Sequence, residues 1–276
     1  MTTLAVKLLL APSFVVCASL VARRYGPRIG GLVGGLPVVA GPILLVYALD
    51  HGRAFAADAA TGTLLGVVSL AAFVVVYGRL AGRYFWGACM LAGWLMFGAA
   101  TVAFSALSVS PIVALGFAIT GLVVALAWLP RAHGDPQPYD PPPAWDLPLR
   151  AGCALVLVLA LTGVAGWLGP RLSGLLAPFP VITTVLATFT HAQRGTDELL
   201  RLLRGMLSGF GAFALFCFTL AVTLPSLDIA ASFGLATTLA LLAQAAMIAL
   251  SAQPGTLSRA SWWRIRSRSS AKRVAS

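Results

Sequence analysis

The chain has 276 residues, of which 59% are hydrophobic and only 10% are charged, and its mean hydropathy is +0.91. Soluble globular domains carry about 25% charged residues, so this composition excludes an ordinary soluble protein. A formal net charge of +11 is compatible with nucleic-acid binding. However, the basic residues stand in short segments between apolar runs and in one C-terminal run, so we expect them to contact a membrane surface and no nucleic acid.

Nine apolar stretches follow one another along the chain. They cover residues 4–22, 29–49, 58–78, 85–106, 109–129, 150–168, 172–191, 203–224 and 229–250. A helix of about 20 residues crosses the roughly 30 Å of hydrocarbon in a bilayer. Helices also satisfy their backbone hydrogen bonds internally, as lipid requires. The sequence therefore predicts an all-α, polytopic integral membrane protein with nine transmembrane helices.

Lysine and arginine are distributed unequally over the two sides of this nine-span arrangement. One side carries 16 of these residues and the other carries three. Cytoplasmic segments of membrane proteins are enriched in Lys and Arg. We therefore predict an inner (plasma) membrane protein whose N-terminus is outside and whose C-terminus is cytoplasmic.

The sequence matches itself at one fixed offset, which is the shift that places Gly26 on Gly169. The matches concentrate in Gly, Pro and Arg, which have special backbone or charge roles, so shared hydrophobicity does not account for them. The same shift brings Pro27 and Arg28 onto Pro170 and Arg171, Pro37 onto Pro180, Gly52 onto Gly195, and Gly62 and Gly66 onto Gly205 and Gly209.

This shift carries spans one to four onto spans six to nine and leaves the fifth span as a connector. A single connecting span inverts the second copy, which gives a 4 + 1 + 4 inverted repeat. The predicted units are a first repeat over 1–108, a connector helix over 109–129, a Pro-rich cytoplasmic linker over 130–149, a second repeat over 150–250 and a basic tail over 251–276. Inverted repeats are typical of secondary transporters, although a scaffold or a channel can also contain one.

Each predicted repeat has one span that is rich in helix breakers, and the two spans correspond under the shift. Proline removes a backbone donor and displaces a carbonyl four residues earlier, so we expect the carbonyl of Val33 to lose its helical partner. Paired broken helices indicate a substrate site near the middle of the membrane. The candidate substrate-binding residues are Gly34, Gly35, Pro37, Gly41, Pro42, Pro178, Pro180, Thr183, Thr184 and Gln244. Simple kinks or close glycine packing, as at Gly31, Gly62 and Gly205, are the alternative interpretation.

A second set of residues lies near the predicted mouths. Arg28 and Arg171 are preserved by the repeat, and each follows a Gly-Pro pair, so they are candidates for binding a lipid headgroup or an anionic substrate. Asp50 and His51 fall in the predicted outer loop, and His191 falls at the corresponding inner loop. These are candidate gate residues, with solvated loop charge as the alternative.

No pattern in the sequence indicates catalysis. The chain has no HExxH, GxSxG or P-loop motif and no Cys/His cluster, so we expect neither an enzyme nor a cofactor nor a metal site. The predicted function is a small-molecule secondary transporter or a lipid flippase, with the bilayer and an unknown small molecule or lipid as its partners. A non-transporting membrane scaffold is the alternative, and a homodimer is left open.

One segment resembles a known family. The run Gly174-Leu175-Leu176-Ala177-Pro178-Phe179-Pro180, followed by His191 and Gly195, is similar to the small GlpM-like inner-membrane proteins, whose short chains look like one copy of this repeat. The resemblance covers about 50 residues and implies an inner-membrane location. The 4 + 1 + 4 plan also resembles the drug/metabolite exporters in outline, which is an architectural analogy.

Overall fold

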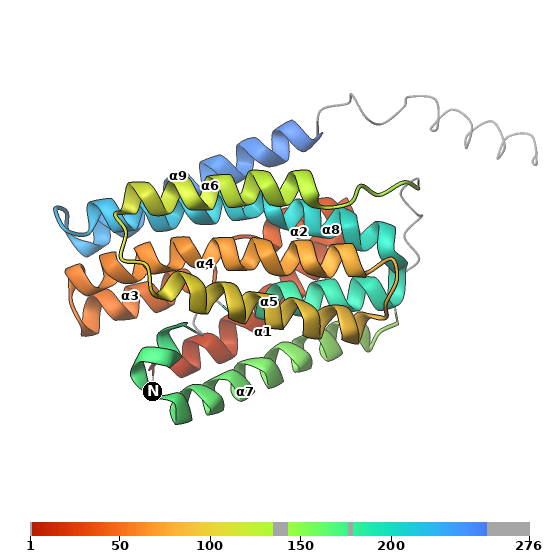
Figure 1. Cartoon of the computed structure of the whole chain (residues 1–276), viewed down its shortest axis with the longest axis horizontal. Coiled ribbons are helices and arrows are strands. Elements are labelled where there is room, and N and C mark those ends of the chain that lie inside the picture. The colour runs from red at the N-terminus through yellow and green to blue at the C-terminus, as the bar shows by residue number, and fades with distance from the viewer. Residues whose placement is uncertain (1, 135–142, 176–178, 253–276) are drawn as a thin grey trace, which may run out of the picture.

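The computed structural model describes residues 2–134, 143–175 and 179–252, and side chains over 11–134, 143–160 and 179–249 (Figure 1). The described chain is all-α, as predicted. Its nine helices are α1 (Thr2–Tyr25), α2 (Pro27–Gly34), α3 (Ala40–Asp50), α4 (Arg53–Leu80), α5 (Trp86–Ser105), α6 (Pro111–Trp128), α7 (Asp146–Leu175), α8 (Val181–Thr223) and α9 (Ile229–Ala252).

Five helices of the described chain are long and apolar enough to cross a membrane. They are α4, α5, α6, α8 and the part of α9 over Ile229–Ala249, and they contain the predicted spans 58–78, 85–106, 109–129, 203–224 and 229–250 to within two residues at each end. These helices identify a multi-pass membrane protein in contact with lipid.

One predicted span and two predicted loops have a different form in the structure. The stretch 29–49 is not one helix, because it divides into α2 and α3 around the segment Gly35–Val39. The predicted inner loop after residue 191 is helical instead, because α8 continues through it with one non-helical residue, Gly195. The predicted outer loop is likewise short: Asp50 ends α3, and α4 begins at Arg53.

Helices α4 and α8 form the centre of the bundle. α4 packs against α5, α6 and α8, while α8 also packs against α2 and α9 (Figure 1). In α8, 72% of the most apolar window is buried, compared with 22% in each of α5, α6 and α9. The peripheral helices therefore turn most of their apolar side chains outward, where lipid rather than water is their solvent.

Glycines allow α2 and α8 to approach at backbone distance. A Cβ atom on Gly31 would overlap the carbonyl oxygen of Leu202, and one on Gly205 would overlap that of Arg28. Gly35 and Gly209 meet in the same way. The prediction of glycine packing faces is thus confirmed here. It is wrong for Gly62, which faces open space.

This contact predicts opposite effects for two glycine substitutions. Gly205→Ala would push a methyl group into the Arg28 carbonyl and should cost roughly 2 kcal/mol of stability through overpacking. Gly62→Ala places the same methyl group in open space and should be neutral or stabilise the helix by up to about 1 kcal/mol. The apparent unfolding temperatures of both variants in detergent would measure the difference. Equal temperatures would contradict the backbone contact between α2 and α8.

Candidate functional site

The segments around the two predicted breaks touch each other. Gly34, at the end of α2, lies three residues before Pro37, and Ile182 lies two residues after Pro180. A Cβ atom on Gly34 would be 3.0 Å from Cδ1 of Leu186 and 3.9 Å from Cγ2 of Ile182. The structure therefore brings the end of α2 and the start of α8 together, although they are far apart in sequence.

The first break satisfies most of its own backbone. The amide of Leu36 donates to the carbonyl oxygen of Val33 at 3.0 Å, and that of Gly41 donates to Pro37 at 2.8 Å. The expectation that the Val33 carbonyl loses its partner is thus wrong, because the chain tightens into a three-residue turn there. A side chain also contributes: Nε2 of the buried Gln244, on α9, donates to the Leu32 carbonyl at 2.6 Å. Its Oε1 has no hydrogen-bond partner among the described residues.

The second break is covered by α5. Thr184 is 2% exposed, and its Oγ1 accepts a hydrogen bond from the indole Nε1 of Trp94 at 3.0 Å. The backbone amide of Thr184 donates to Pro180, and the ring of Phe179 lies 5.5 Å from that of Trp94. Thr183 is also buried. Pro178 lies outside the described residues.

A strip of polar side chains extends from Thr184 along α8. Thr188 and His191 follow at helical spacing, so the three share one face of the helix. Tyr77 of α4 is fully buried near Thr188 and makes an edge contact with the ring of His191 at 5.9 Å. Tyr77 Oη, Thr188 Oγ1 and His191 Nδ1 lack hydrogen-bond partners among the described groups. Unpaired buried polar atoms are costly, and they often mark functional sites.

Beyond His191, a network around a buried carboxylate connects three helices. Asp146, at the start of α7, is 0% exposed and accepts hydrogen bonds from Arg23 at 2.6 Å, Arg150 at 2.8 Å and Gln193 at 2.6 Å. Burial by itself raises the pKa of Asp146, but the Gln193 and Arg150 hydrogen bonds and the nearby positive charges outweigh it, so this pKa lies below its usual value. The network ties α1 to α7 and α8.

The other predicted residues are dispersed. Gly41 faces the ring of Phe216, and Pro42 lies in the first turn of α3. Asp50, the last residue of α3, and His51, which follows it, are exposed, and the ring of His51 stacks on that of Phe55 at 4.8 Å. The side chain of Arg28 is exposed near Arg204. Arg171 belongs to the part of α7 whose side chains are not described.

Sequence reasoning missed four of the residues that build this region. Trp94 and Tyr77 resemble ordinary core aromatics in the sequence, and Asp146 and Gln193 resemble loop and turn residues. Asp146 could have been suspected, because it is an isolated carboxylate four residues before Arg150 at the start of an apolar helix. Among the described residues, no group of three His, Cys, Asp or Glu side chains could hold a metal ion.

Comparison with protein-family models, with curated proteins and with solved structures finds no significant match. The resemblance to GlpM-like proteins therefore stays a prediction from one motif.

The Asp146 network predicts a pH-dependent loss of stability. Asp146→Asn leaves two arginines without their carboxylate and should lower the free energy of unfolding by roughly 3 kcal/mol at neutral pH. Because folding lowers this pKa, the contribution is complete above the unfolded value of about 3.9 and is lost as pH falls through the folded value.

Thermal unfolding of wild type and Asp146→Asn in detergent from pH 3 to pH 8 would test this prediction. The difference should be constant above about pH 5 and should shrink at the acidic end. Asp58→Asn is the matched control, since Asp58 is exposed. A difference that persists unchanged at the lowest pH would contradict the network.

Proposed function

We propose that this chain is a membrane transporter that moves a small molecule or a lipid by alternating access between two inverted halves. The observation that carries the proposal is the antiparallel packing of α4 and the part of α8 after Gly195, two segments that correspond under the sequence offset. Two equivalent units in opposite orientations provide two similar gates around one site.

Helix bounds and backbone conformation support the equivalence of the halves. α4 ends at Leu80, and α8 ends at Thr223, the residue that the offset pairs with Leu80. The first residues of α5 and α9, Trp86 and Ile229, are paired in the same way. Gly52 has φ 89° and ψ 167°, and Gly195 has φ 78° and ψ −175°. This region of backbone space is accessible essentially to glycine alone, so its recurrence at equivalent positions supports a duplicated unit.

Contacts at both ends support the antiparallel orientation. At one end, Oγ1 of Thr196 donates to the carbonyl of Ala81 at 3.0 Å, so α8 after Gly195 begins where α4 finishes. At the other end, Nη1 of Arg53 donates to the carbonyl of Leu227 at 2.9 Å, so α4 begins near where α8 finishes. The corresponding segments thus point in opposite directions, as inversion requires.

The last helix of each half covers the break in the other half. Gln244, on α9, binds the end of α2 through the Leu32 carbonyl. Trp94 and Phe97, on α5, pack on Phe179 just before α8. This reciprocal arrangement supports one shared site between the halves, with Gln244 and Thr184 as its hydrogen-bonding groups.

The polar strip of Thr184, Thr188, Tyr77 and His191 supplies the route in this proposal. Hydroxyl and imidazole groups with unused hydrogen-bonding capacity can replace the water around a polar substrate group inside the membrane. The network of Asp146, Arg23, Arg150 and Gln193 lies at one end of the bundle, the charged end, and closes the route there. Positive-φ Gly52 and Gly195 are the candidate hinges, because Gly52 separates α3 from α4 and Gly195 interrupts α8. We assign the charged end to the cytoplasm from the excess of arginine there.

Water access to Thr188 tests the proposal without knowledge of the substrate. With Cys17, Cys89, Cys153 and Cys217 replaced, Thr188→Cys should react with membrane-impermeant thiol reagents added from either side of oriented vesicles. Adding Asp146→Asn weakens closure at the charged end. It should raise the reaction rate from that side by about fivefold or more and lower the rate from the other side, because the two open states compete.

Val67→Cys is the control, because Val67 is fully buried in the apolar core of α4. It should stay unreactive from both sides. A Thr188→Cys protein that is unreactive from both sides, with and without Asp146→Asn, would favour a static scaffold. Reactivity from one side that Asp146→Asn does not change would also contradict alternating access.

A further inference from the structure

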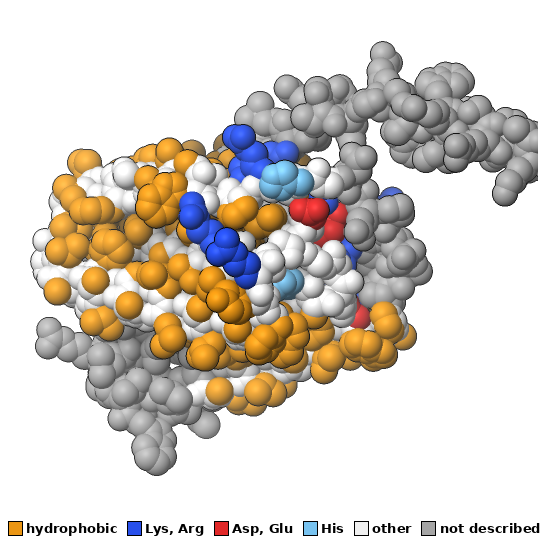
Figure 2. Space-filling model, turned by 45° about the vertical axis from the view of Figure 1, so that its right-hand side comes forward, with side chains coloured by type: hydrophobic (Ala, Val, Ile, Leu, Met, Phe, Trp, Pro, Cys, Tyr) orange, Lys and Arg blue, Asp and Glu red, His pale blue; other side chains and the backbone are white. Residues whose placement is uncertain are grey.

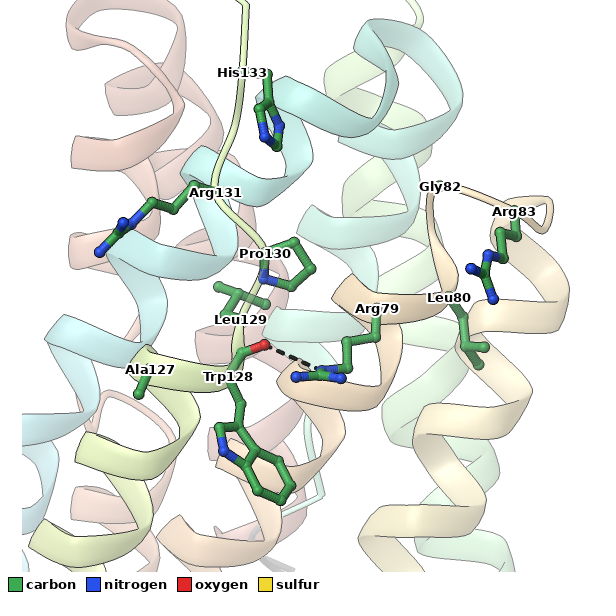
Figure 3. A pocket seen from close by; sticks show the side chains of 10 residues that line it. All are labelled: Arg79, Leu80, Gly82, Arg83, Ala127, Trp128, Leu129, Pro130, Arg131 and His133. Atoms are coloured by element: carbon green, nitrogen blue, oxygen red, sulfur yellow. Dashed lines mark hydrogen bonds between the residues drawn. The ribbon is translucent and has the colours of Figure 1, made fainter.

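A basic cavity lies at the charged end, and none of its lining residues belongs to the polar strip. Its volume is about 930 Å³. It is formed by the end of α4, the turn that leads to α5, and the segment that follows α6 (Figure 3). The lining residues that bear on its chemistry are Arg79, Arg83, Arg131, His133 and Trp128.

The residues that line the cavity carry a net positive charge. Its lining includes three arginines and no carboxylate. The ion pairs of the described chain use other arginines, namely Arg23, Arg150, Arg194 and Arg201. The nearby carboxylate of Asp197 accepts hydrogen bonds from the backbone amides of His133 and Gly134. Figure 2 shows the basic, acidic and His side chains gathered at one end of this face, while hydrophobic side chains cover its flank.

Arg79 and Arg83 are the two arginines that the end of α4 and the turn after it supply to the cavity. Nε of Arg79 donates to the carbonyl of Trp128 at 3.1 Å, which fixes the guanidinium and leaves its terminal nitrogens available. The side chain of Arg83 is exposed and makes no hydrogen bond or ion pair within the described chain. In Figure 3 the guanidinium of Arg79 is turned toward Trp128, that of Arg83 lies beside Leu80, and that of Arg131 is directed away from both. Two planar guanidinium groups match the oxygens of a phosphate better than they match a single point charge.

The position of the cavity indicates a lipid rather than a soluble anion. Trp128 is 61% exposed, and its ring lies 5.5 Å from the Arg79 guanidinium carbon. Exposed Phe85 and Trp86 stand on the α5 side. Such aromatic residues mark the headgroup level of a membrane. The exposed apolar side chains of α5 and α6 continue from this level along the flank and include Leu91, Leu95, Ile119 and Val123.

We propose that this cavity binds the phosphate of an anionic phospholipid, with Arg79 and Arg83 as its ligands, Trp128 at its rim, and the acyl chains on the outer faces of α5 and α6. Arg131 and His133 add positive potential and make no direct contact. The lipid both neutralises the cavity and covers an apolar surface, which a free phosphate cannot do. This site is independent of the transport proposal.

The test measures binding to the full-length protein in neutral detergent, through the rise in apparent unfolding temperature with added ligand. The probes are dihexanoylphosphatidylglycerol, dihexanoylphosphatidylcholine and inorganic phosphate. Wild type should be stabilised by the phosphatidylglycerol and much less by the other two. Arg83→Gln should weaken binding roughly fivefold, and Arg79→Gln with Arg83→Gln roughly 25-fold, because each arginine near a lipid headgroup contributes about a factor of five.

Arg24→Gln with Arg53→Gln is the matched control. It removes the same charge from exposed positions outside the cavity lining and should change affinity less than about twofold. If the control variant loses as much affinity for phosphatidylglycerol as the cavity variant, the binding is general charge attraction, and the proposed site is overturned. Stabilisation by inorganic phosphate equal to that by phosphatidylglycerol would overturn the lipid assignment. Should the double variant fail to fold, Arg83→Gln alone decides, since this side chain is exposed and makes no hydrogen bond or ion pair in the described chain.

Discussion

Backbone groups that leave a helix inside a bilayer must find partners within the protein, because hydrocarbon offers none. The break between α2 and α3 meets this constraint in two ways. Its amides turn back onto nearby carbonyls, and Gln244 reaches across from α9 to the Leu32 carbonyl. The break must therefore be enclosed by other helices. Glycines make this possible, since Gly31 and Gly35 allow α2 to lie at backbone distance from α8.

The same enclosed region contains a row of polar side chains on α8. One face of its first segment carries Thr184, Thr188 and His191, and it leads from the breaks toward the Asp146 network. Apolar side chains at these positions would make folding more favourable, because burying an unpaired hydroxyl costs free energy. The proposed route, which admits a polar ligand when the charged end opens, would give these groups beside Tyr77 and Trp94 a function.

The sequence was sufficient to predict the helical class, five of the spans and the break in the second span, because these follow from apolar length and from proline chemistry. It could not predict that α8 continues through residues 192–202, since the charged residues there resemble a loop. These charged residues have partners within the protein: the Glu198 carboxylate pairs with Arg201, and the Asp197 carboxylate accepts a hydrogen bond from the segment after α6. Nor could it predict the whole Asp146 network. Arg150 is four residues from Asp146, but Arg23 and Gln193 are far away in sequence, and only the packing of α1 and α8 against α7 brings them together.

The central claim is that the two halves are inverted relative to each other, and membrane sidedness measures this directly. Tyr84 and Leu227 are exposed, are paired by the sequence offset, and lie just before α5 and α9. With the native cysteines replaced, Tyr84→Cys and Leu227→Cys should each react with an impermeant maleimide from one side of oriented vesicles, and the two sides should be opposite. Labelling of both positions from the same side would contradict the inverted arrangement, and with it the shared site between the halves.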